Sequence, residues 1–593
     1  MSVVFAMLTS YFLSRTLVPT MMHYLMAAEA ERHATGHDEK TKSWGGRFVA
    51  SFERGFARLR DRYGGMLAWS LEHRQGVVIS FGIFVLCSVS LGPLLGRDFF
   101  PSVDAGLIKL HVRGVPGTRI EETERKFVQI EDTIRTVIPP GEIQTMLDNI
   151  GIPYSGLNLS LSEGALISPA DGEIFIALKE DHASTPAFVR RLRSAIEKQF
   201  PEQTFFFLAP DISTQVLNFG LPAPIDVQVV GAIGNEDASY DVAKEIATRV
   251  SAIPGAADVH LAQVPKQPEL RIDVDRTMAG QLGMTERDVS SDLLVSLASS
   301  SVVAPTYWLD KRGVQYLVAV QTPQRELGSI DAMNTLPISN GSDRPQLLSN
   351  IAAISRTEGP VNITHFNVSR TYDVQANVDG TDLGSVANGV QKIVDAMKPS
   401  LPRGTTVKIK GQVESMESSF RGLAFGLIFA ILLVYLLMVV NFQSWLDPLV
   451  ILMALPGAIA GIAWMLFLSH TTLSVPALMG SIMCVGVATA NSILVVTFAN
   501  DMRVIGLDSV KAALAAGMTR IRPVIMTALA MILGMLPMSL GLGEGGEQNA
   551  PLGRAVIGGL LLATVTTLFF VPVMYSILRR HPPAAVDPTL EEA

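Results

Sequence analysis

The feature that most constrains this chain is a run of 26 residues, 475–500, that contains no Asp, Glu, Lys or Arg. At about 1.5 Å per residue, a helix of this length crosses the roughly 30 Å hydrocarbon core of a bilayer with some tilt. Further long runs share this lack of charge, and they occupy 77–96, 422–441, 448–469, 523–541 and 555–578. With an apolar N-terminal stretch at 1–28, they predict an α-helical membrane bundle of one N-terminal helix and six further spans.

Composition supports this class and argues against several functions. Charged residues make up 17% of the chain, against about 25% in average soluble domains. The net charge of −8 and the lack of a basic run with aromatic residues argue against nucleic-acid binding. Cys87 and Cys484 both lie in apolar runs, so we expect no disulfide framework and no Cys-x-x-Cys metal site. The stretch GLGEGGEQ (541–548) has no Lys-Ser or Lys-Thr and is no P-loop, so we expect no enzyme activity and no cofactor.

The polar linker after the first helix contains a predicted amphipathic helix. Phe48, Phe52, Phe56, Leu59 and Tyr63 recur at spacings of 4, 4, 3 and 4 residues, and several arginines accompany them. Such a helix is suited to lying on an anionic membrane surface. A surface helix that packs on the rest of the protein is the alternative.

The longest polar region follows the second span and alternates between strand and helix patterns. IKLHV (108–112), IDVQVV (225–230) and YDVQANV (372–378) each precede a segment with apolar residues at helical spacing. VKIKG (407–411) follows the last of these segments. The recurrence predicts a large α+β block of split-βαβ (ferredoxin-like) subdomains.

Basic residues in the short loops predict the orientation in the membrane. Residues 31–74 carry nine Lys or Arg, and further basic residues lie in 501–522 and at 579–580. Placing these segments in the cytoplasm puts the α+β block outside, and every span then alternates without contradiction.

The middle of the run 475–500 carries three polar residues, Thr489, Asn491 and Ser492. Polar side chains inside a membrane are costly and usually face other helices or a water-filled path. Hydrogen bonds between helices and a transport path both remain open explanations of this group.

Six motifs give the chain a resemblance to a known family. They are DFFPSVDAG (98–106), GVPGTRIEET (114–123), NFQSWLDPLVILMALPGAIAG (441–461), GVATANSILVVTFAND (486–501), RIRPVIMTALAMILGMLP (520–537) and GEGGEQNAPLGRAVIGG (543–559). In this order and at these spacings they resemble the C-terminal half of a resistance-nodulation-division (RND) efflux permease. The nearest kind is the hydrophobe/amphiphile efflux (AcrB-like) branch.

The resemblance implies a homotrimeric transporter in the bacterial inner membrane with a large periplasmic domain. Such a pump exports small amphiphilic compounds by proton antiport, together with a periplasmic adaptor and an outer-membrane channel. The N-terminal half that the family requires is missing from this sequence, so we expect that the chain alone does not transport. Its expected partners are therefore that half, the lipid bilayer and an amphiphilic substrate.

The resemblance also implies an order of domains. A membrane helix at 1–28 corresponds to a truncated sixth helix. The other expected units are a cytoplasmic linker with an interfacial helix at 29–76, a membrane helix at 77–96, a porter subdomain at 97–210, a second porter subdomain at 211–265 and 361–416, a docking subdomain at 266–360, five membrane helices at 417–580 and a cytoplasmic tail at 581–593.

Candidate proton-path residues follow from the same resemblance. The family joins two aspartates on its fourth helix, which this chain lacks, to a lysine on its tenth. The position of that lysine, just before Asn491, holds Ala490, which carries no charge. Arg520 and Thr527 match supporting positions and lie seven residues apart, about two turns along one helix face. Arg520 as a membrane anchor and Thr527 as a hydrogen bond within its own helix are the alternatives.

Candidate residues for a substrate pocket also depart from the family pattern. Phe175 in EIFIALKE matches one of the phenylalanines that the family's drug pumps place in the first porter subdomain, although its strand pattern also suits a core residue. The stretch that supplies the others offers Ile150, Ile152 and Tyr154 instead. Broad recognition of drugs is therefore not expected.

Two other functions remain open. Heavy-metal efflux by a related RND branch would want paired methionines or carboxylates in the exterior block, where the methionines are scattered and no His or Cys cluster occurs. A non-transporting assembly partner or a truncated fragment is the second, favoured by the absence of acidic residues from the predicted spans.

Overall fold

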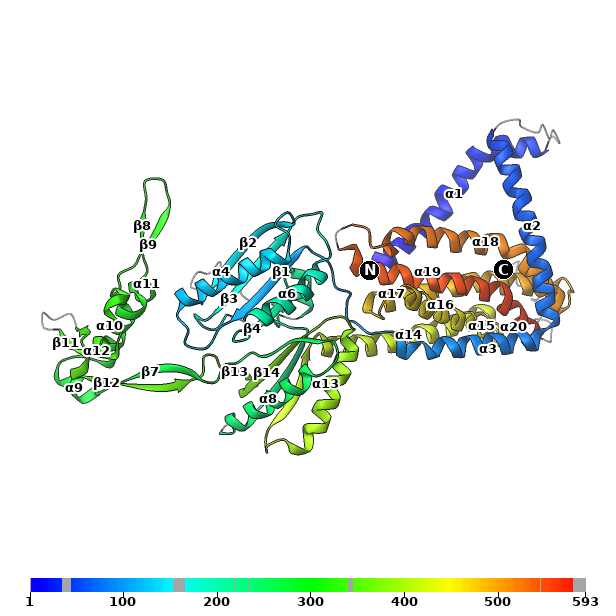
Figure 1. Cartoon of the computed structure of the whole chain (residues 1–593). Helices are drawn as coiled ribbons and strands as arrows, with labels where there is room; N and C mark the ends of the chain where they lie inside the picture. The colour runs from blue at the N-terminus through cyan, green and yellow to red at the C-terminus, as the bar shows by residue number, and fades with distance from the viewer. Residues whose placement is uncertain are drawn as a thin grey trace.

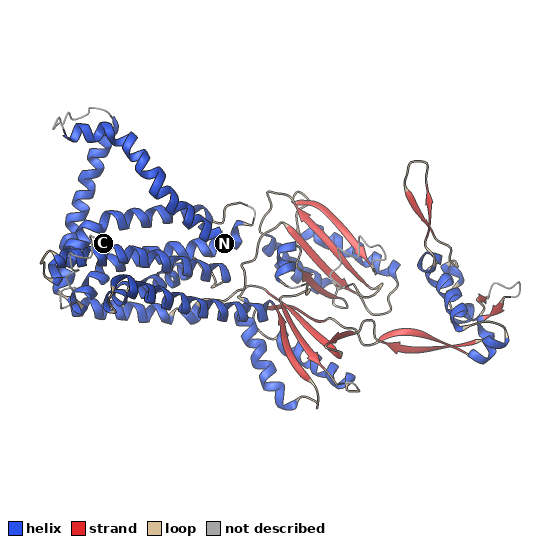
Figure 2. Ribbon diagram, turned by 180° about the vertical axis from the view of Figure 1, so that it is seen from behind, coloured by secondary structure: helices blue, strands red, loops and turns tan. Residues whose placement is uncertain are grey.

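The computed structural model describes residues 2–34, 44–152, 166–218, 220–232, 234–339, 345–543 and 545–579. Figure 1 shows a helical bundle at one end, two sheet-containing units in the middle and a slender module at the other end. Figure 2 shows the same three regions from behind, with the strands confined to the two regions outside the bundle.

Six of the described helices are long and apolar enough to cross a membrane, and all six were expected from the charge-free runs. Their spans are Arg74–Leu94, Gln412–Phe442, Leu446–Leu468, Val475–Val504, Ser509–Ser539 and Gly546–Leu578. The bundle elements within them are α3 (Arg74–Ser90), α14 (Gln412–Phe442), α15 (Leu446–Leu452), α16 (Leu455–Leu468), α17 (Val475–Val504), α18 (Ser509–Ser539), α19 (Ala550–Val565) and α20 (Val571–Leu578).

Two of the differences between the predicted spans and the observed helices have a physical reason. The run 523–541 is the second half of a longer helix, α18, and Pro523 lies inside it. Neighbouring membrane helices can satisfy the carbonyl that such a proline frees, so no helix end is needed there. The span beginning with α15 starts before the predicted Pro448 and includes Asp447, whose charge is paired with Arg579.

The predicted first crossing, 1–28, is not among the six spans. The helix α1 (Ser2–Ala34) extends across it, and residues 4–22 are all exposed. Figure 1 shows α1 standing apart from the bundle. Its crossing of the membrane stays a prediction.

The predicted amphipathic linker helix is α2 (Trp44–Glu72), which runs across one end of the bundle (Figure 1). Tyr63, Leu67 and Leu71 are buried in the bundle core, whereas Phe52 and Leu59 are exposed. One side of the apolar stripe therefore packs on protein, and the other side is free to contact lipid.

The first sheet has strand order β2-β3-β1-β4, with antiparallel neighbours. With two helices on one face, this is the split-βαβ topology. The elements are β1 (Leu107–Arg113), α4 (Ile120–Val137), β2 (Ile143–Ile150), β3 (Asp171–Leu178), α6 (Thr185–Gln199) and β4 (Thr204–Leu208). Its core joins Leu110 of the sheet to Phe127 and Phe188 of the helices.

The second sheet repeats this topology and contains a long insertion. Its strands run in the order β15-β5-β14, and β14 pairs with β6 and with the short β13 on its other side. The elements are α7 (Ile212–Leu217), β5 (Ile225–Val230), α8 (Glu236–Ser251), β6 (Ala256–Leu261), β13 (Thr364–Phe366), β14 (Ser369–Val378), α13 (Leu383–Met397) and β15 (Thr406–Gly411).

The insertion lies between β6 and β13 and forms the slender module of Figure 1. A two-stranded ribbon, β7 (Gln267–Val274) with β12 (Ala352–Gly359), carries it away from the second sheet. Beyond the ribbon lie α9 (Arg276–Gln281), α10 (Glu286–Ala298), α11 (Ser300–Val303), β8 (Thr306–Leu309), β9 (Gln315–Val318), α12 (Ile330–Asn334), β10 (Pro337–Ile338) and β11 (Gln346–Leu347).

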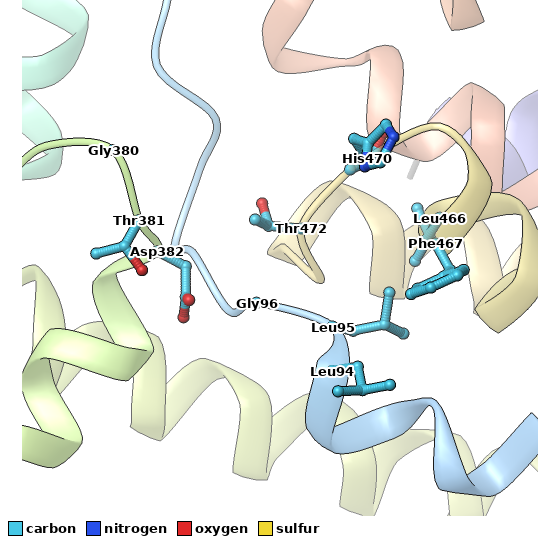
Figure 3. A pocket seen from close by; sticks show the side chains of 11 residues that line it. Leu94, Leu95, Gly96, Gly380, Thr381, Asp382, Leu466, Phe467, His470 and Thr472 are labelled. Carbon is cyan, nitrogen blue, oxygen red and sulfur yellow. The ribbon is translucent and has the colours of Figure 1, made fainter. Parts of the chain in front are cut away.

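A short segment after α3 ties the bundle to the second sheet. Leu473 donates a backbone hydrogen bond of 2.7 Å to Gly96 O, and Asp98 N donates one of 3.0 Å back to Leu473 O. On the other side, Arg97 N donates to Asp382 Oδ2 at 2.8 Å. Residues from 94–96, 380–382 and 466–472 line a pocket of about 420 Å³. Figure 3 shows the side chains around it.

Candidate functional site

The first sheet buries charged side chains on the face that turns away from its helices. Side chains alternate between the two faces of a strand, and the even-numbered residues of β1 pack into the helical core. The odd-numbered residues Lys109, His111 and Arg113 therefore lie on the opposite face. The register of β1 with β3 places Glu173 beside His111 and Asp171 beside Arg113. We call these five buried residues the paired cluster.

The paired cluster is balanced by its own charges. Lys109 Nζ lies 3.5 Å from Glu173 Oε2, and Arg113 Nε donates to Asp171 Oδ1 at 3.1 Å. The His111 ring lies between the carboxylates, with Nδ1 3.9 Å from Glu173 Oε1 and Nε2 3.9 Å from Asp171 Oδ1. Burial alone would raise the pKa of Asp171, but the nearby His111 and the charge of Arg113 hold it below its ordinary value. Because the carboxylates sit at opposite edges of the ring, one cation cannot bind all three groups.

An aromatic stack extends this polar face to the second sheet, across the contact between β4 and β6 that we call the seam. Phe206 of β4 stacks on His111 with ring centroids 4.2 Å apart and on His260 of β6 at 3.6 Å. Arg113 Nη1 also crosses the seam and donates to Leu261 O at 3.0 Å. Burial, with the charge of Arg113 and His111 nearby, lowers the pKa of His260 to about 3, so its imidazole is neutral at physiological pH.

The second sheet buries oxygen-bearing side chains on the same kind of face. Asp226 and Gln228 alternate along β5, and Asp373 of β14 pairs with Gln228 across the sheet. Gln228 Nε2 donates to Asp226 Oδ2 at 2.9 Å, and Gln263 Nε2 donates to Asp373 Oδ2 at 2.7 Å. Within the described part of the chain, Asp226 Oδ1, Gln228 Oε1 and Asp373 Oδ1 are buried and accept no hydrogen bond. We call Asp226, Gln228 and Asp373 the acceptor cluster.

No cation among the described residues compensates the two carboxylates of the acceptor cluster. Asp226 is 1% exposed and Asp373 is 8% exposed, yet neither makes an ion pair within those ranges. Lys408 and Lys410 belong to β15, the other neighbour of β5, and lie on the same face of the sheet as the acceptor cluster. Lys408 Nζ lies 4.5 Å from the ring centroid of Phe366. Lys410 Nζ pairs with Glu414 Oε2 at 2.8 Å.

Burial without a cation changes how these two carboxyls titrate. Burial, then the charge of Asp373, raises the pKa of Asp226 to about 7. Burial also raises the pKa of Asp373, against hydrogen bonds from Gln263 and neighbouring threonines. Carboxylate and amide oxygens of this kind can take up either protons or hard cations. The described residues contain no group of three His, Cys, Asp or Glu spaced to hold a metal by themselves.

In the membrane, the structure brings together two of the predicted proton-path residues. Thr527 Oγ1 donates to Asn491 Oδ1 at 2.9 Å, joining α18 to α17, and shares this hydrogen with Val524 O at 3.0 Å. Asn491 is buried, whereas Ala490 lies on the adjacent, exposed face of α17. Asn491 therefore serves at least as a bond between helices, and a role in proton transfer stays a prediction.

The third candidate, Arg520, lies two turns from Thr527 on the same helix. Its guanidinium carbon is 4.9 Å from the ring centroid of Phe498, seven residues after Asn491 on α17. Its Nε is buried and donates to no acceptor among the residues that the structure describes. Because α17 and α18 pack antiparallel, the contact of Arg520 with Phe498 lies two helical turns from the contact of Thr527 with Asn491.

The predicted pocket residues do not converge. Phe175 lies beside Lys109, whose Nζ is 5.2 Å from its ring centroid, on the face of the paired cluster. Ile150 packs into the helical core on the opposite face of the sheet, and Ile152 is exposed after the end of β2. Tyr154 lies outside the described residues. A pocket shared by these residues has no support from their placement, and a substrate role for any of them stays a prediction.

Sequence analysis did not predict three polar sites, namely the two clusters on the sheets and an ion pair in the bundle. The sequence signal of the clusters is the presence of polar residues at alternate positions in strands such as IDVQVV (225–230), but the strand prediction rests on the apolar positions alone. The other site is the ion pair of Asp447 with Arg579, in which Nε and Nη2 donate at 2.7 and 2.6 Å. A single aspartate at the start of a helix gives no sequence signal of its partner.

Comparison with known proteins gives the chain a family context. A profile of the AcrB/AcrD/AcrF family matches residues 1–579. The cobalt-zinc-cadmium resistance protein CzcA of Cupriavidus metallidurans is 27% identical over 537 residues, which are 89% of this chain and 49% of that protein. Protein HelA of Legionella pneumophila is 27% identical over 97% of this chain and 53% of its own length. Swarming motility protein SwrC of Bacillus subtilis is 26% identical over 98% of this chain and 52% of its own length.

A solved structure agrees with these relatives. The crystal structure of a heavy metal efflux pump superposes with a TM-score of 0.74 and 26% identity, covering 89% of this chain and 53% of that one. The chain thus spans about half the length of the proteins that it matches.

Proposed function

Because the chain belongs to the AcrB/AcrD/AcrF family of RND permeases, we propose that it is part of an efflux pump that exports a divalent metal cation. In this proposal the bundle lies in the bacterial inner membrane, and the two sheets and the slender module lie in the periplasm. The pump works as a trimer with an adaptor and an outer-membrane channel. The proposed cargo follows the names of the relatives, among which a cobalt-zinc-cadmium resistance protein and a heavy metal efflux pump are prominent.

The acceptor cluster is the observation that carries the choice of cargo. Asp226 Oδ1 and Asp373 Oδ1 are buried and lack a donor among the described residues, whereas each Oδ2 accepts a hydrogen bond from a glutamine. Burying a carboxylate without a compensating charge is costly, so such groups are retained where they bind a proton or a cation. Because a pump must release its cargo, an incomplete ligand set completed by water suits it better than a closed site.

The same geometry gives less support to amphiphile export, the expectation drawn from the AcrB-like resemblance. Apolar ligands call for a concave pocket lined by aromatic and aliphatic side chains. Phe175 and Ile150 lie instead on opposite faces of one sheet, and Phe175 neighbours charged groups.

For the energy source we propose proton antiport, with Asn491 and Thr527 ordering the proton path through their 2.9 Å hydrogen bond. Arg520 supplies the positive charge that Ala490 does not. In this scheme Asn491→Ala lowers proton-driven export, while Ser481→Ala on the same helix removes only a hydrogen bond to the carbonyl of Ala477 and leaves export unchanged.

Cation binding by the purified full chain tests the cargo directly. Isothermal titration with Zn²⁺, Co²⁺ and Cd²⁺ at pH 7.5 should show binding that the Asp226→Asn and Asp373→Asn variants weaken at least about tenfold, since each removes an anionic oxygen donor. Asp395→Asn, an exposed carboxylate of the same subdomain, is the matched control and should leave binding unchanged. Equal binding by all four proteins would refute the metal cargo.

Tolerance assays in a pump-deficient strain then separate metal from amphiphile export. Expression of the chain with the remainder of its pump should raise tolerance to the metals and leave tolerance to amphiphiles unchanged. The opposite pattern would restore the amphiphile interpretation.

A further inference from the structure

The last membrane helix is interrupted by a π-helical segment. After α19 ends at Val565, residues Thr566–Phe570 form a π-helix, and the α-helix resumes as α20. A π turn holds one residue more than an α turn, so every side chain beyond it is rotated by about 100°. The orientation of α20 therefore depends on this segment.

A proline just beyond the segment explains why the helix breaks there. Pro572 has no backbone N–H, so it cannot donate to the carbonyl of the residue four positions earlier, Leu568. That carbonyl accepts a hydrogen bond of 2.7 Å from the hydroxyl of Tyr63, which lies on α2. Burial raises the pKa of the Tyr63 phenol far above its ordinary value, so the donor keeps its proton at every physiological pH.

Further contacts hold the π segment against α2, α3 and α17. Phe569 meets the Tyr63 ring edge-on at 5.2 Å, and Phe570 stacks on Phe81 of α3 at 3.9 Å. The hydroxyls of Thr567 and Ser492 lie 2.9 Å apart and join the segment to α17. Contacts from α2, α3 and α17 thus add to the backbone hydrogen bonds of the segment itself, such as that from Val571 N–H to Thr566 O.

The residues beyond the break close one end of the bundle. Tyr575 donates to Asn500 Oδ1 at 2.6 Å, and Arg579 forms its two hydrogen bonds to Asp447. Arg503 Nη1 adds a bond of 2.9 Å to the backbone oxygen of Arg579. All three contacts require the rotation that the π segment imposes on α20.

We propose that Thr566–Phe570 is a hinge and that Tyr63 of α2 is its latch. With the latch closed, the Leu568 carbonyl is satisfied and α20 holds Arg579 against Asp447. When α2 moves away, the carbonyl loses this donor, the hinge loosens and the ends of α15, α17 and α20 separate. The position of the linker helix α2 thereby determines whether this end of the bundle is closed. This inference does not depend on which cargo the pump exports.

A simpler explanation is that Tyr63 only fills space between α2 and the bundle. The two explanations differ in what the hydroxyl does. A latch depends on the pairing of one hydroxyl with the carbonyl that Pro572 leaves free, so its loss should matter only while the proline is present. A packing role depends on the ring, which phenylalanine preserves.

A double-mutant cycle on the full chain in lipid nanodiscs tests the proposal. Amide hydrogen exchange of the peptide covering 566–578 should rise about tenfold in Tyr63→Phe, because a buried carbonyl loses its donor. Pro572→Ala restores an N–H four residues from Leu568, so Tyr63→Phe should add nothing in that background. Pro572→Ser returns the same N–H if the alanine variant does not fold.

Tyr435→Phe is the matched control, since Tyr435 also donates to a backbone carbonyl, that of Trp445, away from the π segment. It should leave exchange of 566–578 unchanged. An equal effect of Tyr63→Phe with and without Pro572 would overturn the latch, as would no effect in either background.

Discussion

The two sheets have the same topology and bury polar residues on the same kind of face, but they neutralise them differently. In the paired cluster, Lys109 forms an ion pair with Glu173, and Arg113 forms one with Asp171. In the acceptor cluster, two carboxylates are as deeply buried with no ion pair among the described residues. A balanced cluster fixes structure, because each charge already has its partner. A cluster with an excess of negative charge can still bind a proton or a cation.

The largest loss of stability is expected when one charge is removed from the paired cluster. Asp171→Asn leaves Arg113 buried without its carboxylate, and breaking a buried pair in this way costs about 3 to 5 kcal/mol. Hydrogen exchange of the β1 and β3 peptides in the full chain should report that loss. Asp132→Asn, whose partner Arg135 is exposed, should cost less than about 1 kcal/mol. A similar small loss at both positions would mean that the paired cluster is not structural.

Removing a carboxylate from the acceptor cluster should have the opposite sign. The pKa of Asp226 in the folded state, about 7, lies above that of an unfolded Asp, so its contribution to stability is present at acid pH and is lost as the pH rises through about 7. Asp226→Asn should therefore protect β5 and β14 at pH 8 by about 2 to 4 kcal/mol relative to the parent chain. It should also flatten the pH dependence between about pH 4 and 7. Destabilisation at pH 8 would show that the carboxylate has a counter-charge.

A loss of stability of intermediate size is expected when an ion pair at the seam between the two sheets is removed. Arg193 of α6 donates to both oxygens of Asp258 on β6, at 2.7 and 3.0 Å, and so joins the first subdomain to the second. Arg193→Ala should cost about 2 kcal/mol in protection of β4 and β6, since among the described residues Asp258 then keeps only a neutral donor, Asn377. The adjacent Arg190→Ala is the control, because Arg190 is exposed and lies 3.7 Å from its partner. Equal effects would indicate that the seam does not depend on this arginine.

The smallest effect is expected at a lysine that shares the face of the acceptor cluster. Lys410 pairs with the exposed Glu414, and surface pairs of this kind contribute about 0 to 1 kcal/mol. Lys410→Ala should therefore leave both the stability and the titration of Asp226 nearly unchanged. A clear rise in the pKa of Asp226, followed by carboxyl infrared absorption, would show that Lys410 compensates it after all.

The sequence was most informative where a single physical rule applied along a continuous stretch. Runs without charge predicted the six spans, and the alternation of strands with amphipathic helices predicted the split-βαβ subdomains. The family of RND permeases was also correctly inferred from six short motifs. The AcrB-like branch and its amphiphile cargo were less well supported, since the relatives include named metal pumps.

What the sequence could not supply was pairing between distant residues. The pocket residues illustrate this: Phe175 faces Leu147 across β3 and β2, and Ile150 lies three residues further, which turns it to the other side. The register that decides this is set by tertiary packing. In the same way, nothing near Asp447 in the sequence indicates Arg579, and nothing near Pro572 indicates Tyr63.

The measurement that tests the central claim most directly is the number of protons released when the full chain binds Zn²⁺. If the acceptor cluster binds the cation, Asp226 must give up its proton, so near pH 6.5 we expect release of about one proton per ion bound. Release should decline toward pH 8.5 and be absent in Asp226→Asn. Binding without proton release, or release that Asp226→Asn does not alter, would contradict the assignment of these carboxylates to the cargo.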